Sequence, residues 1–427
     1  MSDKFDAIVV GAGPAGCATA CKLARAGLEV LVVERGKFPG AKNMTGGVIY
    51  GPVLDSLFPG APGDIPVERA IGRHVICLLS DRSSVSLDFN MAGSGDRNGY
   101  TVLRSRFDRW LANKVEEAGG IVAAGLRADD LLWQGQRVVG ITAGGDEFRA
   151  DAVIAADGVN STMATKAGLR VNLSPENVNQ GVKEVIGLPR EAIEERFGLT
   201  SDSGAAIHFL GFCTRGVHGG GFLYTNKESL SLGVVVQLKA LMESNLKSVD
   251  LLESFKEHPT VREYIRGGTT VEYSAHLVPA GGLRMVPRLF TDGLLVAGDA
   301  AALVLATGRA LEGINFAVAS GIAAAETVLK AKERNDFSKE SLSVYEKLLA
   351  DSFVLQDLKT FREAPRFLEN QRLYQTYPEL ACKLAEEVFR VDGKPKKKLW
   401  QLARQEMKGR VSIWQLLRDG LSARSSL

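Results

Sequence analysis

Asp6-Ala-Ile-Val-Val-Gly11-Ala12-Gly13-Pro14-Ala15-Gly16 is the stretch that decides the fold, together with Val32-Val33-Glu34-Arg35 a short distance further on. The apolar residues before the glycines predict a buried parallel strand, and the glycines follow it without a spacer. A helix is predicted from Pro14 to Ala26, with Gly27 as its C-terminal stop. Residues 28–33 predict a second strand. This order of strand, glycine-rich turn, helix, strand and acid is typical of a dinucleotide-binding unit.

Each of the three glycines in the turn is needed for a different structural reason. Gly11 permits the tight turn, Gly13 lets the backbone approach a pyrophosphate, and Gly16 lets the helix pack close to the strand. The helix N-terminus offers free N–H groups and a partial charge of about +0.5, which suits a diphosphate. Glu34 stands where a carboxylate meets a ribose hydroxyl, and an acid there argues against a 2′-phosphate. We therefore predict a dinucleotide site rather than a chance glycine loop, although the motif does not tell which dinucleotide it binds.

The whole chain has the composition of a soluble globular protein. It has 427 residues, 45% of them hydrophobic and 24% charged, which is enough for two or three domains. A net charge of +2 gives no reason to expect a nucleic-acid partner. Phe5 already belongs to the first strand, so no room is left for a signal peptide, and the apolar stretch 313–329 falls short of the ~20 apolar residues of a spanning helix. We expect a cytoplasmic protein that can still lie peripherally on the inner face of the cytoplasmic membrane.

The five cysteines (Cys17, Cys21, Cys77, Cys213 and Cys382) are scattered and include no CxxC pair. The first two are at positions i and i+4 of the predicted helix, where core packing is the expected role and redox work the alternative. No clustered thiols are present for an iron–sulfur centre, and the five histidines have no metal-ligand spacing. We therefore predict no metal site.

Further elements follow from alternation and turn residues. Residues 36–47 predict a flexible loop and residues 51–66 an irregular surface segment. Residues 102–108 open a helix that Gly119 and Gly120 close. Strands are predicted at 75–79, 85–89, 126–132, 138–142 and 151–156, then, in an antiparallel sheet, at 205–210, 221–225, 230–236 and 269–276, with one helix at 249–257 between them. A long helix follows at 313–332, and the remainder is helical and more polar.

Two more polar turns come at the ends of predicted strands. Asp157-Gly158 follows the strand at 151–156, and Gly298-Asp299 follows residues 293–297. Ligands bind at the carboxyl ends of strands in open α/β sheets. Each turn also has a plainer explanation, because Asp-Gly is a common turn and Gly-Asp before a helix can be a cap.

The order and spacing of these three motifs resemble the flavoproteins of the para-hydroxybenzoate-hydroxylase-like fold. This resemblance implies one FAD extended between two domains, with Glu34 at the adenosine ribose and Asp299 at the ribityl–pyrophosphate region. It also implies that the helix beginning near Gly313 points its N-terminus at the flavin and stabilises negative charge at the N1–C2 edge. No second GxGxxG motif is present, so we expect no NAD(P)H domain, and without paired redox cysteines we expect no disulfide-reductase chemistry.

The predicted fold class is therefore α/β: a Rossmann-type FAD-binding domain interleaved with an antiparallel-sheet substrate domain, plus a C-terminal helical region. The predicted ranges are 1–75, 101–170 and 281–335 for FAD binding, 76–100 and 171–280 for the substrate or quinone domain, and 336–427 for the helical, basic region.

Several further segments resemble the electron-transferring-flavoprotein:quinone oxidoreductase group, and within it the FixC branch, over essentially the full length. They are Lys42–Gly47, Val102–Asp108, Gly181–Glu184, Gly219–Thr225 and Glu272–His276. This resemblance implies that the protein accepts electrons from a two-subunit electron-transfer flavoprotein and passes them to a quinone. The resemblance further implies that, in Fix systems, the electron-transfer flavoprotein bifurcates the electrons of NADH between ferredoxin and quinone.

The resemblance also implies site residues. Tyr224 and His276 are candidates for orienting a quinone or delivering protons to it, with ordinary strand packing as the alternative. Arg309 and Glu312 are additions to the expected flavin loop and have no assigned role. The predicted FAD-binding residues are Gly11, Gly13, Pro14, Ala15, Gly16, Glu34, Arg35, Lys42, Gly46, Gly47, Arg104, Ala128, Asp157, Gly158, Gly298, Asp299, Gly308, Gly313, Ile314 and Asn315.

The C-terminal part departs from the larger members of the group, which carry a cysteine-ligated [4Fe–4S] domain there. Cys382 is the only cysteine after Cys213, and one thiol cannot hold a cluster. We expect either a separate ferredoxin-like iron–sulfur subunit, as the FixC resemblance implies, or direct exchange between flavin and donor. Residues 394–427 carry nine Lys and Arg against two acids, a net charge of +7, with apolar residues at near-helical spacing. Either this helix docks on the body with a solvated basic face, or it binds anionic lipid or an acidic protein.

Three other functions share parts of these patterns. A prenyl-chain reductase, resembling geranylgeranyl reductases, shares the fold and the Arg104 region but needs a long apolar tunnel. An aromatic monooxygenase shares the fingerprint and both later turns, but its NAD(P)H oxidation is accelerated by a phenolic substrate. The third is a flavin-bearing subunit that mainly docks other proteins through its basic tail.

Overall fold

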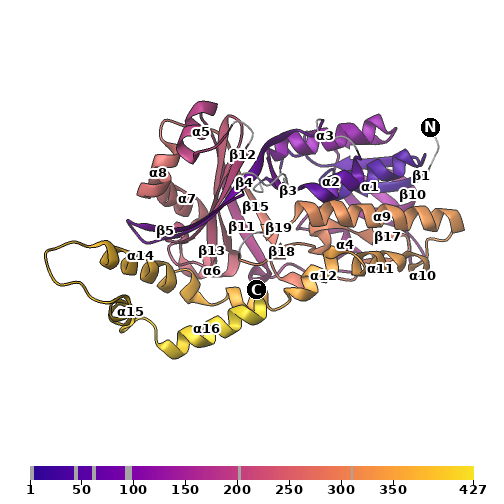
Figure 1. Cartoon of the computed structure of the whole chain (residues 1–427). Coiled ribbons are helices and arrows are strands. Elements are labelled where there is room, and N and C mark those ends of the chain that lie inside the picture. Colours follow the sequence, from indigo (N-terminus) through magenta and orange to yellow (C-terminus); the bar gives the residue numbers. More distant parts are fainter. Residues whose placement is uncertain (1–3, 43–46, 60–63, 92–98, 201–202, 309–310) are drawn as a thin grey trace.

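The computed structural model describes residues 4–42, 47–59, 64–91, 99–200, 203–308 and 311–427. Two large sheets, each with its own helices, stand side by side, and the last helices of the chain run along one side of the molecule (Figure 1). A third sheet is only the short pair β18 (Leu305–Ala306) and β19 (Leu311–Glu312). The fold is α/β, as predicted.

The first sheet contains the predicted dinucleotide-binding unit. β1 (Phe5–Val10) lies between β2 (Val30–Glu34) and β10 (Asp146–Ala155) and pairs with both in parallel. The strand order is β16-β17-β10-β1-β2-β7. The remaining strands of this sheet are β7 (Ile121–Ala124), β16 (Phe290–Thr291), β17 (Leu294–Val296) and the hairpin of β8 (Ala128–Gln134) and β9 (Arg137–Ala143), which extends β10 at its N-terminal end. Its central strands are almost completely buried, as expected of a parallel sheet covered on both faces.

Three helices pack together on this sheet, with α1 in the middle. They are α1 (Pro14–Arg25), α3 (Arg104–Glu117) and α9 (Ile314–Arg334). A Cβ at Gly321 of α9 would lie 2.3 Å from the carbonyl oxygen of Ala15, so the helices α1 and α9 approach each other closely enough to require a glycine. The predicted helices at 14–26 and 313–332 are confirmed, and Gly27 ends the first with φ +85°.

Residues 313–329 were expected to fall short of a membrane-spanning helix, but α9, which contains most of them, reaches the length and hydropathy of one. It is the one helix in the described ranges that is long and apolar enough to cross a membrane, and 72% of its most apolar window is buried inside the protein.

The second sheet has the strand order β15-β11-β14-β13-β12-β4-β6-β3, with β5 paired to β4. Its strands are β3 (Val48–Tyr50), β4 (Val67–Leu79), β5 (Ser84–Asn90), β6 (Gly99–Val102), β11 (Val178–Gly187), β12 (Ser203–Gly211), β13 (Gly219–Thr225), β14 (Ser229–Gln237) and β15 (Thr269–Pro279). Apolar side chains of one face pack against α5 (Arg190–Phe197), α6 (Leu238–Ser244), α7 (Ser248–Glu257) and α8 (Pro259–Ile265), which form a separate core. β3 and the start of β4 belong to this sheet, although they lie within residues 1–75, which were predicted as part of the FAD-binding domain. The domain boundaries stay a prediction.

Three predictions for this region are wrong in part. β11 to β15 pair antiparallel, as predicted for residues 205–276, but the sheet as a whole is mixed, because β12 also pairs with β4 in parallel. β11 was not predicted as a strand, although it pairs on both sides along its whole length. Four helices, not one, cover the outer face in the described residues. The segment 51–66 is also not simply irregular surface, because α2 (Gly51–Leu57) buries Val53, Leu54 and Leu57 against the first core.

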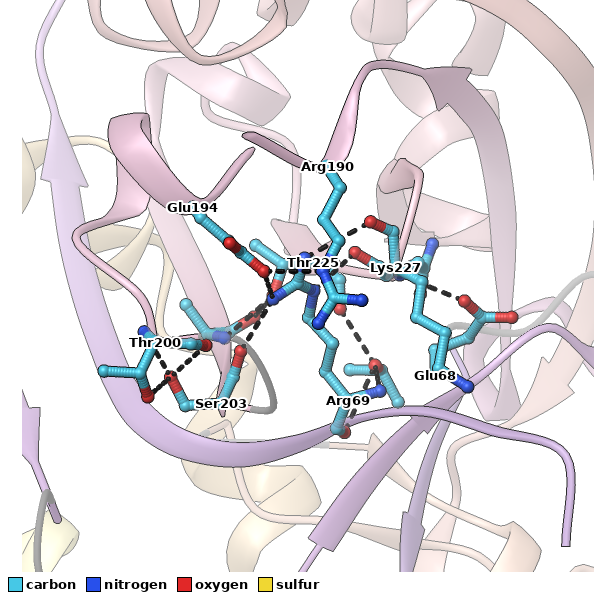
Figure 2. Close-up of polar contacts among 11 residues, drawn as sticks. Glu68, Arg69, Arg190, Glu194, Thr200, Ser203, Thr225 and Lys227 are labelled. Atoms are coloured by element: carbon cyan, nitrogen blue, oxygen red, sulfur yellow. Dashed lines mark hydrogen bonds and ion pairs between the residues drawn. The ribbon is translucent and has the colours of Figure 1, made fainter. Parts of the chain in front are cut away.

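A buried arginine ties the second sheet together at the start of β4 (Figure 2). Arg69 is 2% exposed. Its Nε donates to the carbonyl of Asn226 at 2.7 Å, Nη2 to that of Lys227 at 3.2 Å, and Nη1 to Glu194 on α5 at 3.2 Å. The neighbouring Glu68 accepts from the backbone N–H of Lys227. Strand β4, the β13–β14 turn and α5 therefore share one polar network.

The rest of the chain is helical, as predicted. Its helices are α10 (Lys339–Leu342), α11 (Val344–Ala350), α12 (Phe353–Thr360), α13 (Ala364–Leu368), α14 (Thr376–Phe389), α15 (Leu399–Met407) and α16 (Ile413–Ser426). A further short helix, α4 (Thr162–Lys166), comes earlier in the chain, between β10 and β11. Figure 1 shows α15 standing away from the two sheets and α16 returning toward them. Arg372 fixes this return through two bonds of 2.7 Å to the Asp419 carboxylate.

Candidate cofactor and substrate site

One cavity of about 920 Å³ runs from the glycine turn of the first sheet to the inner face of the second. This volume lies at the upper end of the range for ligand pockets. The predicted residues that line it are Gly11, Gly13, Pro14, Ala15, Glu34, Arg35, Lys42, Gly47, Arg104, Ala128, Asp157, Gly158, Tyr224, His276, Asp299, Gly313 and Ile314. The fold thus gathers residues from both ends of the sequence around a single space.

The glycine turn has the geometry that the sequence predicts. Gly11 has φ +106°, and a Cβ there would lie 2.3 Å from the carbonyl oxygen of Ala156. A Cβ at Gly16 would lie 1.9 Å from the carbonyl oxygen of Gly11, so this glycine allows α1 to pack close to β1. Gly13 is different, because a Cβ there would meet nothing within 4 Å. Its open side faces the cavity, where a diphosphate would come near the first turn of α1.

Glu34 ends β2 with its carboxylate at the cavity wall. Its Oε2 accepts from the N–H of Ala12 at 3.0 Å and its Oε1 from the N–H of Gly36 at 2.6 Å. These bonds fix the carboxylate while leaving each oxygen a further lone pair. The group is therefore held ready to accept hydroxyls of a ribose. Arg35 and Ala128, two further predicted FAD-binding residues, also line the wall.

The two later turns meet in the middle of the cavity, and Arg170 joins them. Its Nη1 donates to the carbonyls of Val159 at 2.9 Å and Ala300 at 3.0 Å. The Asp157 Oδ2 accepts from the N–H of Met163 at 3.0 Å, whereas its Oδ1 and the Arg170 Nη2 are buried without a partner among the described residues. Burial raises the pKa of Asp157 and, against the nearby Arg104 and Arg170, that of Asp299. Buried polar atoms without partners are costly, which fits a polar ligand at this position.

The N-terminus of α9 forms the wall beyond Asp299. No side chain caps its first N–H groups, and Gly313, Ile314 and Ala317 line the cavity. The cavity therefore meets the positive end of a 21-residue helix, as the resemblance implies.

Not every predicted residue lies on the wall. Gly16 and Gly298 are behind it: the N–H of Gly298 donates to Ser320 Oγ, and a Cβ at Gly298 would lie 2.8 Å from that of Ala15. Asn315 turns to Glu312, 3.3 Å away, and Gly308 stands against Leu368 of α13. Gly46 lies outside the described residues. Their contact with a cofactor stays a prediction.

Arg104 brings a fixed positive charge to the cavity. It is 7% exposed and makes two bonds, of 2.7 and 2.8 Å, to the fully buried carboxylate of Asp108 one turn further along α3. Gly40, with φ +87°, passes so close that a Cβ would lie 2.8 Å from the Arg104 carbonyl. The predicted loop 36–47 is therefore packed against α3 at this point.

The two predicted quinone residues lie on the same face of the second sheet but not side by side. Tyr224 is on β13 and His276 on β15, with β14 and β11 between them. Burial, with Arg104 and Arg35, lowers the pKa of His276 to about 4, so its imidazole is neutral at pH 7. Burial raises the pKa of Tyr224, which keeps the phenol protonated. Their roles stay predictions.

Sequence reasoning missed several residues at the cavity wall and behind it. Arg170 is behind the wall, where it binds the carbonyls of Val159 and Ala300. It follows a plain turn, and nothing in its sequence surroundings distinguishes it from a surface arginine. His74 and His208 line the cavity on β4 and β12. Their signal was the alternation of the strands, which places His208 on the same face as Ala206, but a histidine at such a position is equally typical of a solvent-facing strand.

Fold and site together define a FAD-dependent oxidoreductase. Residues 6–75 match the family model described as FAD dependent oxidoreductase. Residues 179–278 match the one described as ETF-QO, ubiquinone-binding, and residues 364–427 the one described as ETF-QO/FixC family C-terminal domain.

Relatives and solved structures agree with these models. The chain is 44% identical to the probable electron transfer flavoprotein-quinone oxidoreductase YdiS of Escherichia coli K12, over 100% of this chain and 99% of the relative. It is 45% identical to protein FixC of the same strain, over 92% of each. A geranylgeranyl bacteriochlorophyll reductase-like protein from Thermoplasma acidophilum shares the fold with a TM-score of 0.74 at 21% identity, over 98% of this chain and 99% of that one. The chain belongs to the electron transfer flavoprotein–quinone oxidoreductase/FixC family.

Proposed function

We propose that this protein takes electrons from a two-subunit electron-transfer flavoprotein and delivers them to a membrane quinone. The observation that carries the proposal is the continuous cavity of about 920 Å³, which joins the dinucleotide cradle to a sheet face whose segment, 179–278, matches a ubiquinone-binding family model. A cofactor in the cradle and a ring on the sheet would thus share one enclosed space.

The chain's own residues hold and orient the reactants. Glu34 would hold the adenosine ribose of FAD, Gly13 the diphosphate, and Asp299 the ribityl region. When bound, FAD supplies a ring system that accepts and donates electrons singly or in pairs. The first turn of α9 and the Arg104 guanidinium favour negative charge beside it, and the surrounding protein excludes water.

The electron donor is tested by anaerobic mixing of the purified holoprotein with each candidate. We expect NADPH or NADH alone to leave the flavin absorbance unchanged, and a reduced electron-transfer flavoprotein to bleach it. A quinone analogue added next should restore the oxidised spectrum. Rapid bleaching by NADPH alone would instead indicate the monooxygenase. Reoxidation by a prenyl-chain double bond, with no response to quinone, would indicate the prenyl reductase.

We also propose a ferredoxin-like iron–sulfur subunit as a further partner. All five cysteines are buried and free, and no group of three or more potential metal ligands was found in the described ranges. Co-expression with a ferredoxin-like protein of the same cell, followed by co-purification and iron analysis, tests this: iron that stays with this chain alone at cluster stoichiometry would contradict it.

The protein's place in the cell is proposed to be the cytoplasmic face of the membrane, reached through α15 and α16. Several large apolar side chains of these helices are exposed, with Trp414 81% and Trp400 58% accessible. They stand among the nine basic residues of segment 394–427, a combination typical of helices that lie on anionic lipid.

A further inference from the structure

Strand β15 carries a row of polar side chains that leads from the surface of the molecule to the cavity. Glu272, Ser274 and His276 stand at every second position of the strand, so all three lie on the same face. His276 lines the cavity, whereas the side chain of Glu272 is 35% exposed. The row therefore has one end in solvent and the other at the cofactor site.

A buried lysine joins this row from the neighbouring strand. Lys183 of β11 lies directly opposite Ser274, so its side chain rises on the same face. It is 3% exposed, and its Nζ lies 3.1 Å from Oε1 of Glu272. Burial, together with the nearby Arg104, lowers the pKa of Lys183 against the attraction of Glu272. The Lys183 ammonium therefore releases a proton more readily than that of a surface lysine.

The hydroxyl of Ser274 lies between the lysine and the cavity. Its Oγ is buried and has no hydrogen-bond partner in the part of the chain that the structure describes. Buried hydroxyls are nearly always paired, so such an atom is expected to bind a water molecule. His276 follows two residues further along the strand, a rise of about 7 Å. One or two hydrogen-bonded waters span an interval of this size.

The part of the cavity wall that reaches solvent on β4 and β5 has a different character. Ile76, Leu87 and Phe89 line the cavity there, and all three side chains are exposed. Hydrocarbon side chains neither bind nor release protons. The row on β15 instead offers a carboxylate, an ammonium, a hydroxyl and an imidazole in succession, each of which exchanges protons with its neighbours.

We propose that this row, together with Lys183, is the route by which protons enter the cavity from solvent. Glu272 collects a proton from water and passes it to Lys183, which releases one toward Ser274. Water bound at Ser274 carries the proton to His276, whose ring takes it up at one nitrogen and releases the proton of the other. Each group has its starting charge again after one passage.

Flavin chemistry creates the need for such a route. Reducing a bound FAD takes two electrons and at least one proton, which ends on ring nitrogen N5. The electrons come from the donor, whereas the proton comes from bulk water, which is left as hydroxide. The proposal goes beyond the proposed function, because this proton is needed whichever protein supplies the electrons and whichever compound accepts them.

Proton uptake is measured directly, without a protein donor and without a quinone. A laser flash generates reduced methyl viologen, which gives electrons but no protons to the oxidised holoprotein. A pH indicator in a solution without buffer follows proton uptake, and absorbance follows flavin reduction. We expect Glu272→Gln and Ser274→Ala to slow proton uptake at least tenfold, with the same number of protons taken up per flavin, because a route changes the rate of protonation and not its extent.

Azide separates a lost route from a distorted site. Its conjugate acid is small and uncharged, so it carries protons through the protein to the cavity. Millimolar azide should restore fast proton uptake in Glu272→Gln and Ser274→Ala and leave that of the wild type unchanged. Glu272→Asp keeps a carboxylate at this position and should retain most of the wild-type rate.

Glu253→Gln is the matched control. Glu253 is exposed on α7 and lies 2.9 Å from Lys256, so this change breaks a similar ion pair on the other face of the sheet. The variant should take up protons at the wild-type rate. Urea unfolding of all the variants checks that each has kept its fold.

The outcomes separate this route from the proposed function. Wild-type rates of proton uptake in Glu272→Gln and Ser274→Ala would overturn the route. Slow uptake that azide does not restore would also overturn it, because the changes would then act on the surroundings of the flavin and not on proton access. Neither result bears on the electron donor or the acceptor. A holoprotein that no electron-transfer flavoprotein reduces, but whose proton uptake follows these expectations, would overturn the donor and support the route.

Discussion

Gly13 and Gly16 belong to one turn, yet the space around them differs completely. A Cβ at Gly16 would enter the backbone of Gly11, whereas a Cβ at Gly13 would enter only the cavity. Sequence reasoning assigned the packing role of Gly16 correctly, because the geometry of a strand–turn–helix unit is local and repeats among proteins. The role of Gly13 at a diphosphate stays a prediction. Sequence reasoning could not find Arg170, whose importance comes from backbone carbonyls of two segments distant in the sequence.

The two glycines therefore predict opposite defects. Gly13→Ala should leave the apoprotein's unfolding free energy unchanged and lower flavin binding, because the methyl group takes up space next to α1. Gly16→Ala should lower the unfolding free energy by about 1–3 kcal/mol, because it forces α1 away from β1. Flavin-to-protein absorbance ratios and urea unfolding of the apoproteins measure the two effects. Equal losses of stability would contradict the assignment.

Arg69 gives a second prediction at this scale. Arg69→Met removes the guanidinium of a residue that is 2% exposed, so several backbone carbonyls and the Glu194 carboxylate each lose a hydrogen-bond donor. We expect a loss of about 3 kcal/mol of unfolding free energy. Arg190→Met removes the other partner of Glu194, but this side chain is 40% exposed, so the loss should stay below about 1 kcal/mol. Urea midpoints of the two variants measure the difference, and similar midpoints would contradict the role of Arg69.

Among the elements, helices and strands with strong periodicity were predicted from sequence, and β11 was not. β11 runs Val178–Gly187 and contains Asn179, Gln180, Lys183 and Glu184, which read as a polar segment. Lys183 is nevertheless 3% exposed and pairs with Glu272 at 3.1 Å, so a cross-strand ion pair compensates a polar sequence in the sheet. The parallel pairing of β12 with β4 could not be predicted either, because the local sequence of a strand does not show in which direction its partner strand runs.

The docking of α16 predicts a pH dependence. Hydrogen bonding from Arg372, and from Tyr377, lowers the pKa of Asp419 well below its usual range. A lowered pKa in the folded state means that the stabilisation is present above the unfolded pKa of about 3.9 and is lost as the pH falls below it. Asp419→Asn should release α16 already at pH 7.

The release is measured as a fall in the fluorescence anisotropy of a dye attached to Ser425→Cys on α16. The dye labels this position selectively, because the five native cysteines are buried and should not react. We expect high anisotropy between pH 5 and 8 for the native sequence and low anisotropy throughout for Asp419→Asn, with unchanged circular dichroism of the body. High anisotropy in that variant would show that apolar contacts alone dock the helix.

For the whole molecule, the sequence indicated two interleaved units around one cofactor, because its three motifs come from separate parts of the chain. It did not reveal which residues of the second sheet gather on the face that lines the cavity, since that depends on the register in which strands such as β12 and β13 pair. The exposed basic and apolar surface of α15 and α16 is likewise a property of the folded chain.

That surface predicts binding to vesicles. The protein should sediment with anionic vesicles more than with neutral ones, and less so as salt is raised, because screening shortens the reach of the charges. Replacing Lys396, Lys397 and Lys398 with Gln should weaken the binding by about 1 kcal/mol for each residue lost near the surface. Trp414→Ala should weaken it at all salt concentrations. Trp133→Ala, 44% exposed on β8, is the control, and an equal effect there would contradict a specific surface.

The interleaving has a consequence for how the protein is made. β1, β10 and β17 are neighbours in one sheet, yet they occupy Phe5–Val10, Asp146–Ala155 and Leu294–Val296. At ribosomal rates of about 5–20 residues per second, the last of them emerges roughly 15–60 s after the first. The cradle has no Asp299 until then, so the nascent chain must wait, partly assembled and with its central strands lacking a neighbour, before a prosthetic group can be loaded. Flavin supply and chaperone protection should therefore matter late in translation, when most of the polypeptide has already left the ribosome.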